Sequence, residues 1–204
     1  MLKVGLTGSI AVGKSFVVSV FKDLGCVTFD ADKIAHLVME PGRPAFDEIV
    51  REFGNGVLDT EGRIDRGKLG AIVFADEFKR KRLNAIAHPR VIEEQDRLLR
   101  EAEQKDPHGI AIIDAALMIE SGGYRRFDKV IVVFCGSEEQ VQRLMNRNQI
   151  TRNDAERRIA AQMSSAEKRR YADFEIDTSG TQEQTRERVA EVYARLRESQ
   201  NRLL

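Results

Sequence analysis

Short apolar runs alternate along the chain with longer stretches in which apolar residues recur at helical spacing. The apolar runs have the length and composition of buried strands, and they cover residues 3–7, 26–29, 110–113, 129–134 and 174–176. Amphipathic helices are predicted over residues 16–24, 44–53, 68–74, 78–103, 137–147, 152–163 and 182–204, with a further helical segment around 34–38. Because strands and helices alternate, the sequence predicts an α/β fold, with a parallel five-stranded sheet between layers of helices.

Several residues mark where the predicted elements begin and end. Gly25 follows the first helix, and Gly is common at a helix C-terminus. Ser164 and Glu167 have the spacing of a capping box, which predicts another helix start. Pro89 predicts that the long helix over 78–103 breaks or restarts.

The region from about residue 35 to 105 differs from the rest of the chain. It contains helical stretches and one turn-rich loop over 54–62, and no convincing strand. The sequence therefore predicts a core made of residues 1–34 and 106–204, with a helical insertion over 35–105.

The first strand leads into a loop that fits G-x-x-x-x-G-K-[ST], the phosphate-binding pattern of nucleoside triphosphate enzymes. Gly8 and Gly13 are expected to adopt torsions that a side chain would block. Lys14 is expected to reach the β- and γ-phosphates of a nucleotide, and the Ser15 hydroxyl is expected to bind Mg²⁺. The phosphate-binding candidates are Gly8, Ser9, Ile10, Ala11, Val12, Gly13, Lys14 and Ser15.

Carboxylates follow two of the other predicted strands, and the carboxyl ends of parallel strands are where ligands bind. Asp30 and Asp32 come at the end of the second strand, where residues two apart point to the same side. One of them is a candidate to accept the proton of an alcohol, and the alternative is that Asp32 only caps the next helix. Asp114 ends the third strand, the position that holds Mg²⁺ through water. Glu120 is a weaker candidate at the same edge, and a helix cap or a surface carboxylate is the alternative for both.

Arginines crowd the region after the fourth strand, and guanidinium groups stabilise the charge that moves in phosphoryl transfer. Arg147 is the first choice, because it stands just before a predicted helix break at 148–149; the others are Arg143, Arg152, Arg157 and Arg158. Several of these must instead lie on solvated helix faces, as must the basic run 79–82. His88 is either a packed or capping residue or part of the wall of an acceptor site.

Net charge, cysteine content and the length of the apolar runs limit the classes of function that the sequence supports. Lys plus Arg and Asp plus Glu both number 33, so the net charge is zero and gives no hint of a nucleic-acid partner. Cys26 and Cys135 each lie in an apolar run, which predicts buried, reduced thiols in a cytoplasmic protein. The chain is expected to enter a core strand almost at once, without a signal peptide, and its apolar runs are too short to span a membrane.

Taken together, these motifs resemble the dephospho-coenzyme A kinase family nearly from end to end. Beyond the phosphate loop, the matching segments are 30–35 (DADKIA), 62–66 (GRIDR) with Leu69, 88–89 (HP), Asp114 with Leu117, Glu120 and Gly122, Arg143 with Leu144 and Arg147, 158–159 with 162–163, and 172–173 with Ile176 and Gly180. The chain departs from the family pattern at three positions. Ala11 replaces a loop glycine, which should be tolerable if its φ is negative; Ala116 stands where the family has Pro, and Asp177 where it has Asn.

The resemblance implies ATP-dependent phosphorylation of the ribose 3′-hydroxyl of dephospho-coenzyme A, with Mg²⁺ as cofactor. It implies Asp32 as the base, with Lys14 and Arg147 as the other catalytic residues. The acceptor would contact Asp30, Asp32, His88 and Leu117 and would lie in the insertion, and a lid would cover about 147–165. Ser15 and, through water, Asp114 would hold the metal ion.

Two other readings stay open from the residues alone. A kinase of another small acceptor, such as a nucleoside monophosphate, would share the loop and the sheet. A regulatory GTPase would need an N-K-x-D guanine-reading motif after a late strand, and the sequence contains none. ATP and dephospho-coenzyme A are thus the expected partners, without nucleic acid or membrane, and the oligomeric state is open.

Overall fold

The computed structural model describes the backbone of residues 1–201 and the side chains of residues 1–200. Two compact units make up the chain. The first comprises Met1–Phe29 and Ala102–Leu204, and the second comprises Asp30–Glu101.

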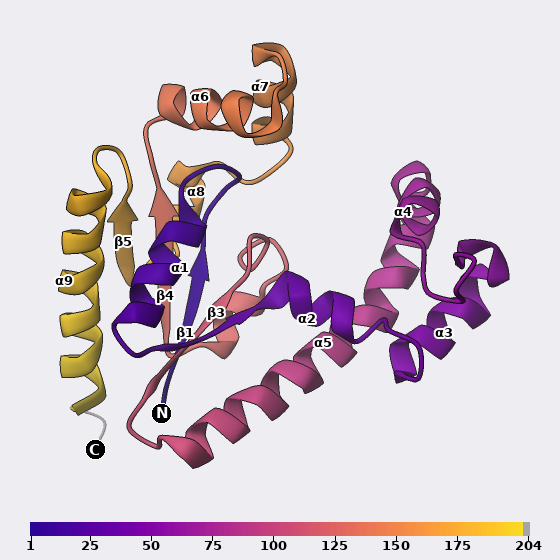
Figure 1. The fold of residues 1–204 in the computed structure, drawn as a ribbon, viewed down its shortest axis with the longest axis horizontal. Helices are drawn as coiled ribbons and strands as arrows, with labels where there is room; N and C mark the ends of the chain where they lie inside the picture. The colour runs from indigo at the N-terminus through magenta and orange to yellow at the C-terminus, as the bar shows by residue number, and fades with distance from the viewer. Residues whose placement is uncertain (202–204) are drawn as a thin grey trace. The chain divides into compact units, whose positions relative to one another are not determined.

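A parallel sheet forms the centre of the first unit (Figure 1). Its strands are β1 (Leu2–Thr7), β2 (Val27–Asp30), β3 (Ile110–Asp114), β4 (Lys129–Phe134) and β5 (Phe174–Asp177), in the order β2-β3-β1-β4-β5. β1 is central and pairs in parallel with β3 and β4, and β4 pairs in parallel with β5. The α/β fold and the five predicted strands are therefore confirmed, each within two residues of its predicted bounds.

The central strands are buried on both faces because helices cover them. The last four residues of β1 are buried, and so are the middle four of β4. The helices α1 (Lys14–Asp23) and α9 (Gln182–Asn201) pack together against the sheet. Phe21 of α1 and Leu196 of α9 are fully buried in one hydrophobic cluster with Leu6 of β1. The predicted helix end at 202–204 lies outside the described residues.

Three helices follow β4, namely α6 (Ser137–Asn148), α7 (Arg152–Ala160) and α8 (Ser165–Arg169), and the 3₁₀ helix η2 (Gly123–Arg126) precedes it. The predicted capping box is confirmed, with Ser164 and Glu167 exchanging hydrogen bonds at the start of α8. The prediction that α7 extends to residue 163 is wrong, because the chain leaves the helix after Ala160. Gln162 and Met163 instead make hydrogen bonds with the phosphate loop.

The second unit is helical, apart from one antiparallel bridge between Leu58 and Ile64. Its elements are α2 (Ala31–Leu37), α3 (Pro44–Phe53), η1 (Asn55–Val57), α4 (Arg66–Ala75) and α5 (Glu77–Lys105), whose last residues belong to the first unit. A small core of its own holds it together, with Ile49, Val57, Leu69 and Val73 buried.

Pro89 does not interrupt α5, so the prediction of a break there is wrong. Proline cannot donate to the carbonyl four residues earlier, which belongs to Ala85. Both Ala85 and Pro89 are exposed, so water can satisfy that carbonyl. The helix therefore lacks one hydrogen bond on its solvent-exposed face and continues past Pro89.

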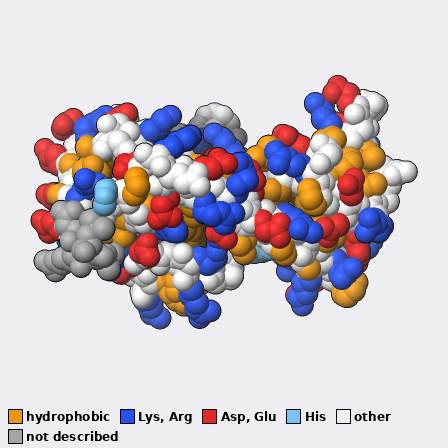
Figure 2. Space-filling model, turned by 90° about the horizontal axis from the view of Figure 1, so that it is seen from below, with side chains coloured by type: hydrophobic (Ala, Val, Ile, Leu, Met, Phe, Trp, Pro, Cys, Tyr) orange, Lys and Arg blue, Asp and Glu red, His pale blue; other side chains and the backbone are white. Residues whose placement is uncertain are grey.

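No helix within residues 1–201 combines the length and the apolar character needed to cross a membrane. On the face shown in Figure 2, Lys and Arg side chains are interspersed with Asp and Glu, so neither sign of charge forms a continuous patch there.

Candidate active site

The phosphate loop joins β1 to α1, as its pattern predicts. Gly13 is the N-cap of α1 with φ +82°, a left-handed conformation that suits glycine. Gly8 is required for a different reason from the one expected. Its φ is not in the left-handed region, but a Cβ on Gly8 would lie 2.6 Å from the carbonyl oxygen of Val133. No side chain caps α1 in the described chain, so its first N–H groups remain available to an anion.

Ala11 adopts φ +62°, which contradicts the expectation of a negative φ at this departure from the family pattern. A left-handed conformation costs a residue with a Cβ about 1–2 kcal/mol. The loop is held in this shape by packing, since Ile10 and Ala11 contact the buried residues Val141, Leu144 and Ala155 of α6 and α7. The loop is thus strained at one residue and supported by the helices beside it.

Lys14 forms an ion pair with Asp114. Sheet register explains why they meet, since Leu6 lies opposite Asp114 and the chain continues from there with a hydrogen bond from Ala115 N–H to the Leu6 carbonyl. The carboxyl ends of β1 and β3 are therefore adjacent, and Asp114 lies beside the loop as predicted.

Ser15 and Asp114 provide the kind of donors that Mg²⁺ prefers. Both supply hard oxygen atoms, and Ser15 is exposed at the start of α1. No group of three or more His, Cys, Asp and Glu side chains in the described part of the chain is arranged to hold a metal ion. The residues fit a Mg²⁺ ion that takes its other ligands from water and nucleotide phosphates.

Asp30 and Asp32 do not share a strand. β2 ends at Asp30, and α2 begins at Ala31, so the expectation that both carboxylates project from one strand is wrong. Asp30 is the N-cap of α2, and its Oδ1 accepts hydrogen bonds from the N–H groups of Asp32 and Lys33 at 2.9 and 3.1 Å. The exposed Asp32 carboxylate accepts no hydrogen bond from the described residues and remains available.

The five candidate arginines have different surroundings. Arg152 forms ion pairs with Glu138 and Glu156, and Arg157 pairs with Asp154. The Arg152 guanidinium lowers the pKa of the Glu138 carboxyl to about 2. Arg147 and Arg158 are exposed, and Arg147 donates only to the neighbouring Asn148 among the described residues, at 2.9 Å. The exposed basic run 79–82 lies on α5, as expected of a solvated helix face.

Arg143 lies closer to the loop than sequence reasoning indicated. Its guanidinium donates to the side chain and the carbonyl of Thr178, at 3.0 and 2.8 Å, and pairs with Glu139. The buried Thr178 hydroxyl in turn donates to the Val12 carbonyl at 2.7 Å. Thr178 therefore ties the end of β5 to the phosphate loop. The only signal in the sequence was a hydroxyl residue two positions after the end of a predicted strand.

Glu120 is a structural partner rather than a free carboxylate. Lys168 of α8 is fully buried, and its ammonium contacts Glu120 at 2.8 Å and the Ala116 carbonyl at 2.7 Å. Burying a lysine requires such partners, because an unpaired buried charge is costly. This pair links α8 to the segment after β3, and sequence reasoning missed Lys168 because it looked like one more charge on a helix face.

The acceptor candidates are divided between the two units. Asp30, Asp32 and His88 belong to the second unit, and Leu117, which is 55% exposed, belongs to the first. His88 is an exposed residue of α5.

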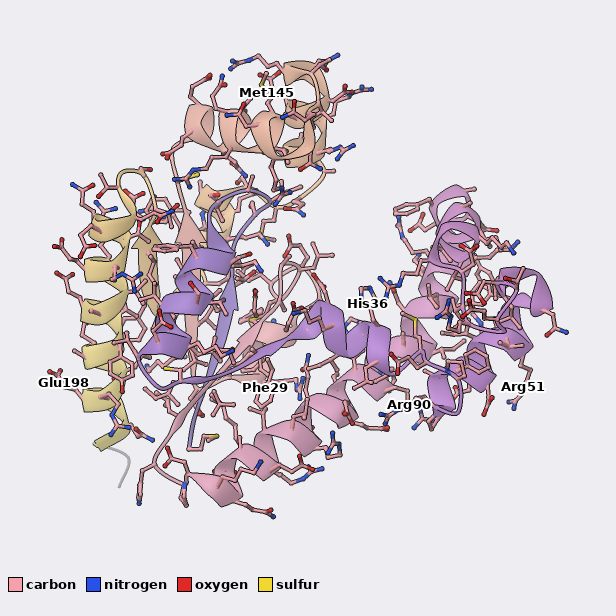
Figure 3. The ribbon with its side chains drawn as sticks, viewed as in Figure 1. Phe29, His36, Arg51, Arg90, Met145 and Glu198 are labelled. Atoms are coloured by element: carbon pink, nitrogen blue, oxygen red, sulfur yellow. The ribbon has the colours of Figure 1, made fainter. Side chains whose placement is uncertain are left out.

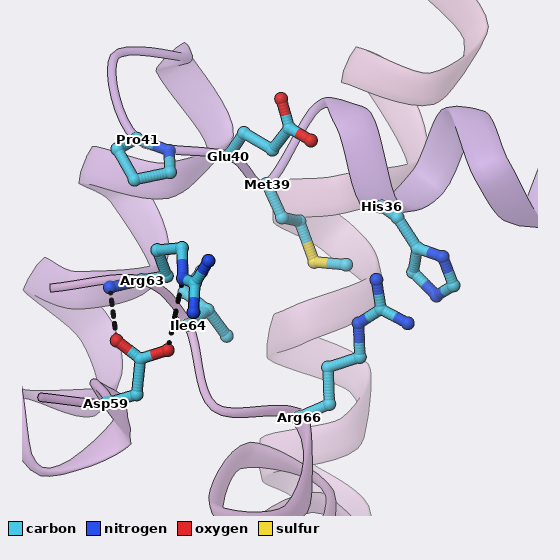
Figure 4. Close-up of a pocket in the computed structure, with 8 residues that line it drawn as sticks. All are labelled: His36, Met39, Glu40, Pro41, Asp59, Arg63, Ile64 and Arg66. Carbon is cyan, nitrogen blue, oxygen red and sulfur yellow. Dashed lines mark hydrogen bonds and ion pairs between the residues drawn. The ribbon is translucent and has the colours of Figure 1, made fainter. Parts of the chain in front are cut away.

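The second unit contains a pocket of about 330 Å³ (Figure 4). Arg66, in the segment that resembles the family's insertion, points its guanidinium toward His36 of α2. Arg63 is held by Asp59 through two hydrogen bonds at 2.9 and 3.2 Å. Met39, Pro41 and Ile64 line the pocket with apolar surface, and Glu40 completes it. The lining therefore combines apolar side chains with basic ones and with the carboxylates of Glu40 and Asp59.

Comparison with known proteins gives a consistent result. The model of the dephospho-CoA kinase family matches residues 2–184. The dephospho-CoA kinase of Geobacillus kaustophilus is 45% identical over 190 residues, which are 92% of this chain and 93% of that protein. The one of Thermobifida fusca is 46% identical over 196 residues, or 96% of each chain. The solved structure of dephospho-CoA kinase from Campylobacter jejuni, 28% identical, covers 97% of this chain and 98% of its own with a TM-score of 0.74. This chain therefore belongs to the dephospho-CoA kinase family.

Proposed function

We propose that this chain transfers the γ-phosphoryl group of ATP to the ribose 3′-hydroxyl of dephospho-coenzyme A, which yields coenzyme A and ADP in the last step of coenzyme A synthesis. Family membership supports the reaction. The observation that carries the proposal is the phosphate loop at the carboxyl end of β1, with the Lys14 ammonium beside the Asp114 carboxylate.

The loop would bind the triphosphate of ATP. The first N–H groups of α1 and the positive end of its dipole attract phosphate oxygens. Lys14 would neutralise the β- and γ-phosphates as the bond between them breaks. Gly8 permits this binding because it has no Cβ that would clash with the Val133 carbonyl, and Gly13 permits it because its left-handed conformation allows the turn into α1.

Ser15 and Asp114 would hold Mg²⁺, Ser15 directly and Asp114 through water. The ion would supply positive charge that offsets the negative charge of the phosphate groups during transfer. Asp114 would also position Lys14, since the two side chains are already paired.

Asp32 is proposed as the residue that accepts the proton of the acceptor hydroxyl. Two observations support this choice over Asp30. Oδ1 of the Asp30 carboxylate accepts hydrogen bonds from two backbone N–H groups, which commits that oxygen to the cap of α2. Asp32 has no such partner, and a general base must be free to reach the proton that it removes.

Arg147 is proposed to stabilise the charge on the transferring phosphoryl group. Its exposed guanidinium is bonded only to Asn148 within the described residues, so it can reorient at little cost. Arg152 and Arg157 would first have to break ion pairs. The lid is proposed to cover about residues 147–165, which include α7.

The second unit is proposed to bind the acceptor, with Asp30, Asp32 and His88 among its contacts and Leu117 contributed by the first unit. The pocket around Arg66 and His36 supports this role, because coenzyme A precursors combine a diphosphate with a long, weakly polar arm.

The proposal is tested by ADP release from MgATP with dephospho-coenzyme A, AMP, CMP, shikimate or no acceptor. Turnover should depend on dephospho-coenzyme A, and mass spectrometry with ³¹P NMR should place the new phosphate on the 3′-oxygen. Faster turnover with AMP or CMP would assign the chain to a different acceptor. ADP release that is equal without any acceptor would indicate ATP hydrolysis instead.

A further inference from the structure

Three hydrogen bonds tie the middle of the phosphate loop to α6 and to the segment after α7. Ser9 Oγ donates to the Met163 carbonyl at 2.9 Å, and the buried Gln140 side chain donates to the Ile10 carbonyl at 2.7 Å. The Ile10 N–H donates to the side-chain oxygen of Gln162 at 2.8 Å. The third bond differs from the others, because its donor is a backbone N–H group of the phosphate loop.

The orientation of the Gln162 carboxamide follows from its partner. A backbone N–H can only donate, so the atom that faces it must be the carbonyl oxygen of the side chain. The NH₂ group is attached to the same carbon and so lies close to the loop as well. Among the described residues no acceptor pairs with that NH₂ group, which leaves its donors free beside Ile10 of the loop.

We propose that Gln162 binds the phosphate chain of ATP while it anchors its own segment to the loop. Its carbonyl oxygen holds the Ile10 N–H, and its NH₂ group donates to a phosphate oxygen. This inference deepens the proposed function and rests on it for the identity of the nucleotide. A neutral carboxamide suits both tasks, since a carboxylate would repel phosphate and an apolar side chain would lose both bonds.

The same contact explains two features of the fold. The chain leaves α7 after Ala160, which brings Gln162 and Met163 to the loop rather than onto a further helical turn. The strained Ala11 follows the anchored Ile10, so the bonds to Ile10 help to hold the left-handed turn. Arg158 lies in the last turn of α7. Anchoring Gln162 therefore fixes where the arginine-bearing α7 ends.

Two variants of Gln162 separate anchoring from donation. Gln162→Glu keeps an oxygen for Ile10 but replaces the donor with a negative charge. Gln162→Leu removes both groups at similar size. Gln142→Leu is the matched control, because Gln142 is exposed on α6 and donates to Glu138, away from the loop.

The first measurement is amide hydrogen exchange of Ile10 by NMR without nucleotide. Exchange should be about tenfold faster in Gln162→Leu, as expected for one lost hydrogen bond, and close to wild type in Gln162→Glu and Gln142→Leu. The second is the Kd of the Mg²⁺ complex of the β,γ-imido analogue of ATP. It should rise about tenfold or more in both Gln162 variants and stay within twofold in the control.

Each readout can overturn its part of the inference. Unchanged Ile10 exchange in Gln162→Leu would refute the anchor, and wild-type affinity in Gln162→Glu would refute donation to phosphate. An equal loss of affinity in Gln142→Leu would show that any apolar substitution in this region has the effect. Neither measurement uses the acceptor, so the outcome does not depend on which alcohol is phosphorylated. A wild-type protein that fails to bind the analogue would instead refute the proposed function itself.

Discussion

Lys14 at the start of α1 and Asp114 at the end of β3 form an ion pair in which the side chains are only 19% and 14% exposed. The pair joins the phosphate loop to the neighbouring strand end. If Lys14 binds the β- and γ-phosphates, nucleotide and Asp114 must share its ammonium. When ATP and Mg²⁺ bind, Lys14 would turn toward the phosphates, and the Asp114 carboxylate could then interact with the hydrated ion. Binding of the phosphates by Lys14 and binding of the metal ion by Asp114 would therefore favour each other.

Replacing Lys14 tests the nucleotide site. Lys14→Met should lower kcat by several orders of magnitude while the thermal unfolding midpoint stays within a few degrees, because the charge on the transferring phosphate would lose its partner. Lys22→Met, an exposed lysine at the other end of α1, should retain wild-type turnover. Comparable turnover of Lys14→Met and wild type in a coupled ADP assay would exclude this loop as the site.

The strained backbone at Ala11 predicts that replacing this residue with glycine stabilises the protein. Ala11→Gly should raise the free energy of unfolding by about 0.5–1 kcal/mol, because the relief of a left-handed alanine exceeds the entropy that glycine loses on folding. Ala194→Gly, at an exposed position inside α9, should instead lower it by about 1 kcal/mol. Urea denaturation measures both, and equal losses in the two variants would mean that Ala11 is not strained.

The two aspartates should behave differently. Asp32→Asn should reduce kcat by about 10²–10⁴ with little change in the KM for ATP, since asparagine keeps the shape but cannot take the proton. Asp30→Asn should leave kcat within a few-fold, because asparagine caps a helix as well as aspartate does. Initial rates with saturating acceptor check this. The opposite ranking would identify Asp30 as the base.

Replacing Arg147 tests the proposed stabilisation of the transferring phosphate, with Arg152 as the control. Arg147→Ala should lower kcat on the order of a hundredfold and raise the KM for ATP less, because the guanidinium matters most when charge moves. Arg152→Ala should change kcat little, since it removes an arginine that is already paired with Glu138 and Glu156. A change in KM alone for Arg147→Ala would make this residue a ground-state binder.

Cys26 predicts a loss of stability at alkaline pH. Burial raises the pKa of its thiol from 9.0 to about 12, with a smaller opposing effect of Arg197. Between these pH values the unfolded chain has lost the proton and the folded chain still holds it, so stability falls as pH rises. From pH 8 to 10.5, wild type should lose about 2 kcal/mol more than Cys26→Ala in urea denaturation. Equal losses would show that the thiol ionises freely in the fold.

Local patterns were enough to predict the sheet and most of the helices. Strands that are buried on both faces appear as apolar runs, and α3 has the predicted bounds because Pro44 and Gly54 mark its ends. The errors lie where solvent exposure or a contact with a distant residue outweighs the local preference. Pro89 stays helical because the carbonyl it leaves unpaired is exposed, and α7 stops early because Gln162 and Met163 bond to the loop.

In the candidate site, too, some residues were predictable from local patterns and others were not. The loop and Asp114 were predictable because one motif and one strand end place them. Asp32 was wrongly assigned to a strand, since the cap formed by Asp30 starts the helix at Ala31, one residue before Asp32. Thr178, Lys168 and Gln162 were missed because their partners lie far away in the sequence.

The position of β1 at the centre of the sheet has a consequence for folding. Leu2 pairs beside Ile110 and Val4 beside Lys129, so the first strand to be synthesised finds both neighbours more than a hundred residues later. Contacts of such high sequence separation slow folding, because the entropy of closing the long loop is lost before the contacts form. An apolar strand with two unpaired edges is meanwhile open to pairing with other chains. The helical unit of residues 30–101, with its local contacts, is free to form first, and completion of the phosphate loop must wait for β3 and β4.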